Sequence, residues 1–170
     1  MTGKLRNLIL IGMPACGKST VGVLLAKYLG YDFIDTDLLI QRREVMRLED
    51  LIRTRGRDVF LGIEEEICSD LQAERTVIAT GGSVVYHDGA MRHLKSMGPV
   101  IYLQVDLDVL EKRLTDAVER GVVFQEGQTL RDLYEERTAL YETYADVTVP
   151  EGTGTLDDTV AAVRRAIAEC

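Results

Sequence analysis

The stretch LILIGMPACGKSTVG, residues 8–22, decides how this chain of 170 residues folds. Gly12 to Ser19 matches the phosphate-binding pattern G-x-x-x-x-G-K-[ST] at every position. The apolar run 8–11 precedes the pattern as a strand would. Apolar residues at helical spacing follow it until Gly30, where a helix is expected to end. A strand, a glycine-rich loop and a helix in this order are the context in which the pattern binds phosphate.

The physical chemistry of this loop predicts a nucleotide site. Glycines let the backbone wrap closely around phosphates, while backbone N–H groups and the helix N-terminus supply donors and positive potential. Lys18 adds a charge near the β- and γ-phosphates, and the Ser19 hydroxyl is a ligand for Mg²⁺. Cys16 is interpreted as a small filler, with a redox role as the alternative. The predicted nucleotide-binding residues are Gly12, Pro14, Ala15, Cys16, Gly17, Lys18, Ser19 and Thr20.

Four more short apolar runs follow, at residues 33–34, 77–79, 100–105 and 147–149. Most of the runs are continuous rather than alternating, which is typical of parallel strands buried on both faces. Amphipathic segments separate them, and Thr155 is expected to cap the last of these as a helix. The pattern predicts one α/β domain over residues 1–170, with helical layers on the faces of the sheet.

Composition narrows the class of partner. The net charge of -8 argues against a nucleic-acid or anionic membrane surface. No run approaches the ~20 apolar residues of a membrane span, and the N-terminal segment is too short and interrupted for a secretory signal. Three cysteines without paired spacing favour a reducing cytoplasm. We expect a cytoplasmic monomer that binds a small-molecule substrate, without nucleic acid or membrane.

Two features suggest where an acceptor binds. Asp35 and Asp37 follow the second predicted strand, and at this spacing on an extended segment their carboxylates would point the same way. One would hold Mg²⁺ or its water and the other a substrate hydroxyl; alternatively Asp37 caps the next helix. Gly81 and Gly82 follow the third predicted strand. They either allow a ligand close to the backbone or form a plain turn.

Two arginines have sequence contexts that suggest a role in the site, whereas two histidines do not. Arg137 falls on the apolar stripe of a helix predicted over residues 130–144, and an inward guanidinium needs an anionic partner, either a protein carboxylate or a substrate anion. Arg120 lies in a loop-like segment, 119–128. This segment and the charged segment 41–58 are hypothesised to be mobile flaps, so that Arg120 is either a lid arginine or a solvated one. His87 and His93 show no metal-site spacing and are expected at the surface.

The pattern of motifs favours a small-metabolite kinase. An Asn-Lys-x-Asp motif for guanine is missing from the sequence, which argues against a GTPase switch, and the length leaves little room for a coupled machine. The chain resembles the shikimate kinase family over nearly its whole length. The resemblance rests on GMPACGKSTVG at residues 12–22, DTD at 35–37, ATGG at 79–82, VIYL at 100–103 and ERTALYETYAD at 136–146.

The resemblance implies a three-layer P-loop kinase fold, with a five-stranded parallel sheet in the order 2-3-1-4-5. It implies ATP and Mg²⁺ as cofactors, an acceptor-binding region at about 36–63 and a lid at about 114–128. On the acceptor side, it implies that Asp37 binds the acceptor hydroxyls, that Gly81 and Gly82 line the acceptor pocket and that Arg137 binds the acceptor carboxylate. It also implies that Asp35 lies near Mg²⁺, that Arg120 is the lid arginine and that Arg113 contacts adenine.

Three departures from the family pattern concern the acceptor. Leu61 stands where the family usually has an arginine that pairs with the acceptor carboxylate, and Ser83 stands in place of a third glycine. The lid sequence also differs after Arg120. Arg57 lies four residues before Leu61 and would share its helix face, so it is a candidate substitute, while Arg53 and Arg55 are weaker candidates in an expected loop. The alternative is a pocket reshaped for another acceptor.

Three hypotheses result. The first is ATP-dependent phosphorylation of shikimate to shikimate 3-phosphate, with Lys18, Asp37 and Arg120 as catalytic residues. The predicted acceptor-binding residues are Asp37, Arg57, Leu61, Gly81, Gly82 and Arg137, and the predicted metal ligands are Ser19 and Asp35. The second is a kinase of the same fold for another hydroxylated metabolite, such as a sugar acid. The third is a regulatory ATP-binding module without an acceptor.

Overall fold

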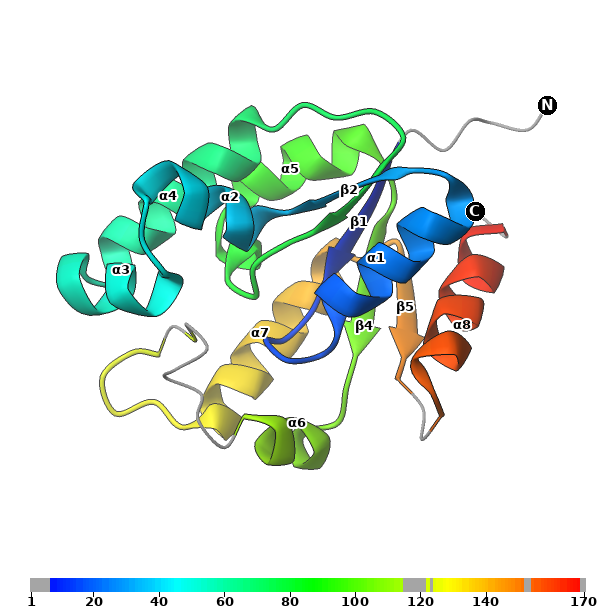
Figure 1. The fold of residues 1–170 in the computed structure, drawn as a ribbon. Coiled ribbons are helices and arrows are strands. Elements are labelled where there is room, and N and C mark those ends of the chain that lie inside the picture. Colours follow the sequence, from blue (N-terminus) through cyan, green and yellow to red (C-terminus); the bar gives the residue numbers. More distant parts are fainter. Residues whose placement is uncertain (1–6, 115–121, 123, 152–153, 169–170) are drawn as a thin grey trace.

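The apolar run of residues 8–11 lies in β1 (Asn7–Ile11), the middle strand of a five-stranded parallel sheet (Figure 1). The structure is a computed structural model, and it describes residues 7–114, 122, 124–151 and 154–168. The strand order β2-β3-β1-β4-β5 confirms the order that the family resemblance implied. The other strands are β2 (Asp32–Asp35), β3 (Thr76–Ala79), β4 (Val100–Gln104) and β5 (Val147–Pro150).

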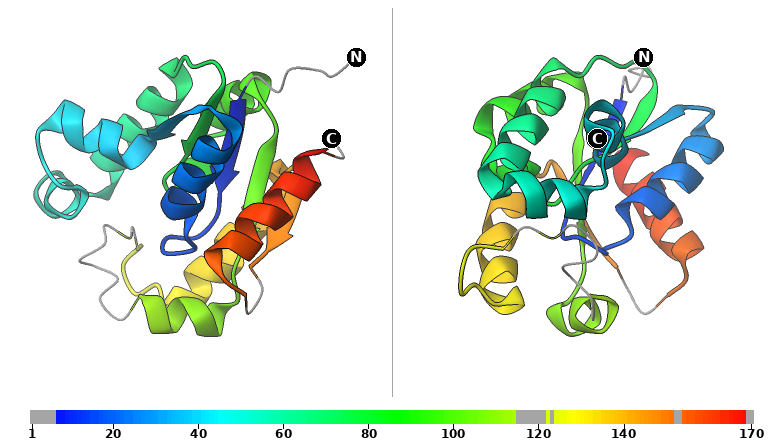
Figure 2. Two further views of the ribbon diagram at one scale, coloured as in Figure 1. Left: turned by 45° about the vertical axis from the view of Figure 1, so that its right-hand side comes forward. Right: turned by 60° about the vertical axis from the view of Figure 1, so that its left-hand side comes forward.

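Helices follow the strands in alternation. They are α1 (Lys18–Leu29), α2 (Thr36–Glu44), α3 (Leu48–Arg55), α4 (Arg57–Asp70), α5 (Asp88–Met97), α6 (Leu107–Arg113), α7 (Leu130–Tyr144) and α8 (Leu156–Ala168), with a short 3-10 helix, η1 (Val84–Tyr86), after β3. Helices α1 and α8 lie side by side on one face of the sheet, and α5 and α7 cover the other (Figure 1 and Figure 2). This arrangement confirms the predicted layers and explains why the central strands are mostly apolar.

Local signals set the helix ends. Gly30 adopts a left-handed conformation, with φ of 66°, and ends α1 as expected. Thr129 and Asp132 form a capping box that starts α7 at the predicted residue, because each side chain accepts from the other residue's backbone N–H. Thr155 accepts from the N–H of Asp158 at the start of α8, as the sequence predicted.

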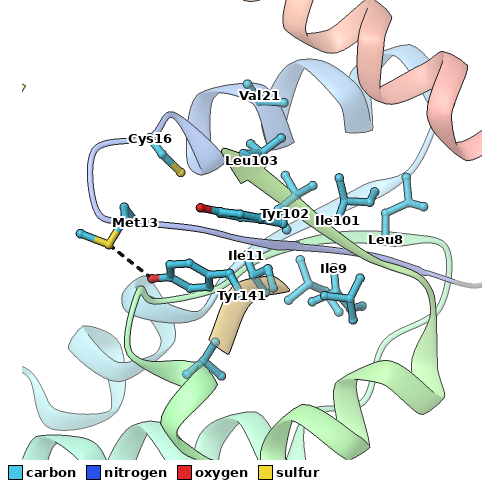
Figure 3. Close-up of a cluster of buried hydrophobic side chains, with 14 of the residues drawn as sticks. Leu8, Ile9, Ile11, Met13, Cys16, Val21, Ile101, Tyr102, Leu103 and Tyr141 are labelled. Atoms are coloured by element: carbon cyan, nitrogen blue, oxygen red, sulfur yellow. Dashed lines mark hydrogen bonds between the residues drawn. The ribbon is translucent and has the colours of Figure 1, made fainter. Parts of the chain in front are cut away.

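The main core surrounds the middle of the sheet. Every residue of β1 is buried, and Figure 3 shows Met13 and Cys16 pointing from the following loop toward the rings of Tyr102 and Tyr141. These two rings stack with centroids 5.0 Å apart. The phosphate loop is therefore tied to the core by its own side chains. This supports the interpretation of Cys16 as a filler.

A second, smaller cluster lies within the group formed by α2, α3 and α4, which projects from the body that carries the sheet (Figure 1). Its buried members are Ile40, Leu48, Leu51 and Phe60. The segment 41–58, hypothesised to be a flap, is mostly helical and belongs to this group. The other hypothesised flap, 119–128, lies partly outside the described residues. In the part of the chain that the structure covers, no helix has the length and apolar character needed to cross a membrane.

Candidate active site

The phosphate loop connects β1 to α1 and depends on glycine at its first position. Gly12 has φ of 148°, and a Cβ atom there would lie 2.7 Å from the carbonyl oxygen of Leu103. Ala15 and Gly17 also have positive φ values, 61° and 92°, so the loop turns back on itself before α1 begins. A loop of this shape before a helix N-terminus is an anion-binding concavity.

The Lys18 side chain is buried and folds back over this loop. Its Nζ donates to the carbonyl oxygens of Gly12 and Met13, both at 2.8 Å. The ammonium group is thereby held at the loop, where a bound phosphate chain would lie. The two carbonyl oxygens are partners for the ammonium group in the absence of a ligand, and these hydrogen bonds hold the loop in its curved conformation.

Ser19 and Asp35 form a pair of oxygen donors beside the loop. Ser19 Oγ donates to Asp35 Oδ2 at 2.6 Å, although the two residues come from α1 and β2. A hydroxyl and a carboxylate suit Mg²⁺, which takes oxygen ligands and usually keeps waters and phosphate oxygens in the rest of its shell. Within the described ranges, no cluster of three or more His, Cys, Asp or Glu residues is arranged to hold a metal ion. A site of this pairwise kind needs no such cluster.

Asp35, not Asp37, caps α2. Asp35 Oδ1 accepts from the backbone N–H of Asp37 at 3.0 Å, so the alternative interpretation of Asp37 as the cap is wrong. The two carboxylates also do not share an extended segment, because the helix begins at Thr36. The local geometry of the N-cap, rather than strand alternation, keeps the two residues close together.

The Asp37 carboxyl has an unusual environment. It keeps some contact with solvent through the cavity, but the surrounding protein desolvates it and raises its pKa to about 7. The negative charges of Glu64 and Asp35 contribute to this raised pKa, and the Lys18 ammonium opposes them. A carboxyl group with a pKa near neutrality is suited to accept a proton from a hydroxyl.

Arg137 faces inward from α7, as its position on the apolar stripe predicted. It is 1% exposed, and its Nε donates to the hydroxyl of Tyr86 at 3.2 Å. A Cβ atom on Gly82 would lie 2.9 Å from Arg137 Nη1 and 2.8 Å from Pro14 Cδ. The close approach expected at this glycine pair therefore joins the phosphate loop to the buried guanidinium.

One cavity of about 330 Å³ joins the donor and acceptor sides. Its lining residues are Pro14, Ala15, Gly17, Lys18, Ser19, Thr20, Asp37, Leu48, Phe60, Glu64, Thr80, Gly81, Gly82, Ser83 and Arg137. A volume of this order is typical of sites for small ligands. The cavity therefore brings most of the sequence-predicted residues together in one place.

Some predicted site residues lie outside this lining. Arg113 pairs with both carboxylate oxygens of Glu151, at 2.9 and 3.1 Å, and donates to the carbonyl oxygen of Ala15 at 3.2 Å. It thus connects α6 to the phosphate loop and to the segment after β5. Gly12 and Cys16 belong to the loop itself, and Asp35 accepts a hydrogen bond from Ser19 Oγ. Arg120 lies outside the described residues.

Arg57 is the first residue of α4, so the helix does reach back as far as the sequence interpretation required. Its guanidinium carbon lies 6.0 Å from the centre of the Tyr86 ring, and that of Arg137 lies 5.3 Å from the same centre. Leu61 is half-buried and is not among the lining residues. Arg53 and Arg55, expected in a loop, belong to helix α3.

Sequence reasoning missed Glu64 and misplaced His87. Glu64 is fully buried and lines the cavity, while His87, expected at the surface, is buried against it. A signal for Glu64 was present: it lies four residues after Phe60 and four before Cys68, two apolar residues buried on the same face of α4. The same spacing argument that found Arg137 would have found this glutamate.

A phosphate loop and a set of acceptor-binding groups in one cavity, on this sheet topology, define a P-loop kinase that acts on a small molecule. The comparisons with known proteins specify the family. The shikimate kinase family model matches residues 14–168, and the chain belongs to the shikimate kinase family.

Relatives and solved structures agree with this assignment. A shikimate kinase from Rippkaea orientalis is 39% identical over 146 residues, which cover 84% of this chain and 77% of that protein. One from Alkaliphilus oremlandii is 34% identical over 160 residues, with 91% and 95% covered. The structure of shikimate kinase from Acinetobacter baumannii in complex with shikimate superposes with a TM-score of 0.89 at 29% identity. The aligned region covers 97% of this chain and 94% of the chain from Acinetobacter baumannii.

Proposed function

We propose that this protein transfers the γ-phosphate of ATP to a hydroxyl group of shikimate and yields shikimate 3-phosphate and ADP. One observation carries the proposal: Lys18 of the phosphate loop, Asp37 and the buried Arg137 line a single cavity. Membership of the shikimate kinase family supports the acceptor, as does the likeness to a shikimate kinase in complex with shikimate.

On the donor side, the residues of the phosphate loop hold the phosphates. Lys18 exchanges its two carbonyl partners for phosphate oxygens and neutralises charge as the phosphoryl group moves. Ser19 and Asp35 would hold Mg²⁺, and their oxygen donors fit that ion. When bound, Mg²⁺ supplies positive charge to the phosphate oxygens. Arg113 is assigned to the adenine of ATP.

On the acceptor side, Asp37 orients the reacting hydroxyl and accepts its proton. The hydroxyl oxygen forms a bond to the γ-phosphorus, and the bond between that phosphorus and the β–γ bridging oxygen breaks, so that ADP leaves with the bond's electron pair. Gly81 and Gly82 let the acceptor approach the backbone closely. Arg120, in the lid at about 114–128, is assigned the role of offsetting the negative charge on the phosphoryl group during its transfer.

The acceptor carboxylate is assigned to Arg137 with help from Arg57. Arg57 and Arg137 contact the same tyrosine ring, and Arg57 Nε is buried without a hydrogen-bond partner among the residues that the structure covers. A second guanidinium is needed because Leu61 carries no charge. The acceptor-binding region is assigned to about 36–63, and we infer a monomeric protein of the cytoplasm.

A coupled assay of ADP release tests the proposal. Shikimate at millimolar concentration should stimulate ADP release with Mg²⁺ present, and the phosphorylated product should carry phosphate on one hydroxyl. A panel of sugar acids serves as the comparison. Turnover of a sugar acid without turnover of shikimate would assign another acceptor, and ATP binding without any stimulation would favour a regulatory module.

A further inference from the structure

Tyr86, the last residue of η1, lies outside the machinery proposed for the reaction. Its side chain is half-buried, and it is not among the residues that line the cavity. The backbone N–H of Tyr86 donates to the carbonyl oxygen of Ser83, a lining residue, at 3.0 Å. The ring and the hydroxyl group of Tyr86 contact the arginines that we assign to the acceptor carboxylate, so the effect of Tyr86 on the acceptor is indirect.

The ring of Tyr86 is shared by two guanidinium groups. The guanidinium carbon of Arg137 lies over the ring at 5.3 Å from its centre, and that of Arg57 lies over it at 6.0 Å. Two cations that share one ring are near enough to repel each other in a partly buried site. The negative face of an aromatic ring attracts both of them, and the attraction is stronger where water is excluded. The ring therefore offsets part of the repulsion between the two arginines.

The hydroxyl group of Tyr86 fixes one of these arginines more closely. It accepts a hydrogen bond from Arg137 Nε at 3.2 Å. Burial raises the pKa of the hydroxyl, as does a hydrogen bond with Glu136, while Arg137 lowers it. The hydroxyl thus keeps its proton at neutral pH, and it accepts from Arg137 while it donates to Glu136. Because Nε is held on this side, Arg137 Nη1 approaches Gly82 in the cavity wall.

Arg57 has few other contacts that would hold it in place. Its Nε is buried without a hydrogen-bond partner among the residues that the structure covers. Its Nη1 lies 3.6 Å from a carboxylate oxygen of Asp58, whose side chain is 96% exposed. An ion pair this long with an exposed partner contributes little. The Tyr86 ring is therefore the contact that keeps the Arg57 guanidinium beside Arg137.

We propose that Tyr86 is a positioning residue that holds Arg57 and Arg137 together as one carboxylate-binding pair. The ring allows Arg57 to serve in place of the charge that is missing at Leu61, and the hydroxyl orients Arg137. This inference rests on the proposed function, and it names the side chain on which recognition of the acceptor carboxylate depends in this chain.

Two variants of Tyr86 separate the ring from the hydroxyl. Tyr86→Phe keeps the ring and should raise the KM for shikimate about 5-fold, whereas Tyr86→Leu loses both parts and should raise it about 30-fold. The value of kcat and the KM for ATP should stay within about twofold of wild type, because binding of the acceptor alone is weakened. The matched control is Tyr31→Leu, which removes a ring that Arg75 contacts at 5.5 Å outside the cavity.

A double-mutant cycle tests the link between the ring and Arg57. Arg57→Ala should raise the KM for shikimate about 10-fold in the wild-type background but less than about threefold in the Tyr86→Leu background, where Arg57 is no longer held. A general packing defect would leave the effect of Arg57→Ala the same in both backgrounds. Tyr86→Met, which fills more of the space of the ring, replaces Tyr86→Leu in the cycle if the leucine variant does not fold.

The outcomes separate the inference from the function on which it rests. Turnover of shikimate by wild-type protein, with an unchanged KM in Tyr86→Leu, overturns the inference alone. So does an equal rise in the KM values for shikimate and ATP, or an effect of Arg57→Ala that is the same in both backgrounds. Wild-type protein that does not use shikimate overturns the proposed function and this inference together.

Discussion

The donor and acceptor halves of the cavity are built from different parts of the chain. The donor half is the backbone of one continuous loop, residues 12–19, with a single charged side chain over it. The acceptor half consists of side chains from four separate segments, represented by Asp37, Glu64, Ser83 and Arg137. Backbone groups recognise phosphate, which every nucleotide shares, whereas side chains recognise one acceptor. Departures from the family pattern such as Leu61 and Ser83 can therefore alter which acceptor binds without changing which donor binds.

The largest effect should come from the donor half. Lys18→Ala should lower kcat by about 10³-fold, because it removes a charge aimed at the transferring phosphoryl group. The rate of shikimate-dependent ADP release measures this. Lys27→Ala, an exposed lysine on the same helix, is the control and should be neutral. A loss of less than about tenfold in Lys18→Ala would contradict the role given to the loop.

Arg137→Met should distinguish the acceptor half of the cavity from the donor half most clearly. The KM for shikimate should rise about 100-fold with the KM for ATP little changed, because the variant removes the buried partner of the acceptor carboxylate. Initial rates over a grid of both substrates give the two constants. Arg131→Met, on the exposed side of the same helix, should leave both constants unaltered. Equal increases in both would argue that Arg137 serves the fold rather than the acceptor.

Arg57→Ala should give a smaller effect of the same kind. If Arg57 supplements Arg137, the KM for shikimate should rise about 10-fold and that for ATP should not. Arg53→Ala is the matched control, since its guanidinium pairs with Asp50 on an exposed part of α3. Leu61→Arg, made separately, should strengthen the use of shikimate. Equal small effects of Arg57→Ala on both substrates would remove Arg57 from the site.

The smallest expected effect is a shift, in Glu64→Gln, of the pH dependence of kcat/KM for the acceptor. Asp37 accepts a proton only when it is ionised, so activity should fall about tenfold per pH unit below its pKa of about 7. Glu64→Gln removes a negative charge that raises this pKa, so the acidic limb should move to lower pH. Glu65→Gln, an exposed neighbour, should leave the limb in place. An unmoved limb in Glu64→Gln would mean that Asp37 is not the titrating group.

The same contrast explains what could be predicted from the sequence. The loop, the strand order implied by the family and the bounds of α7 follow from local patterns or from the resemblance, and all were confirmed. Arg137 was found because its stripe is otherwise apolar. Glu64 was missed because it begins a run of three glutamates, which is usually a solvated face. His87 was misplaced because its burial depends on Glu64, a partner 23 residues away that no local pattern indicates.

The paired carboxylates of Asp37 and Glu64 beside Gly81 affect the stability of the protein as well as its chemistry. The pKa of Asp37 in the folded state, about 7, lies above its unfolded value. The folded state therefore loses stability as the pH rises from about 4 to 7. Hydroxyl groups of a bound acceptor would relieve this repulsion, so shikimate should raise the melting temperature more at pH 8 than at pH 5.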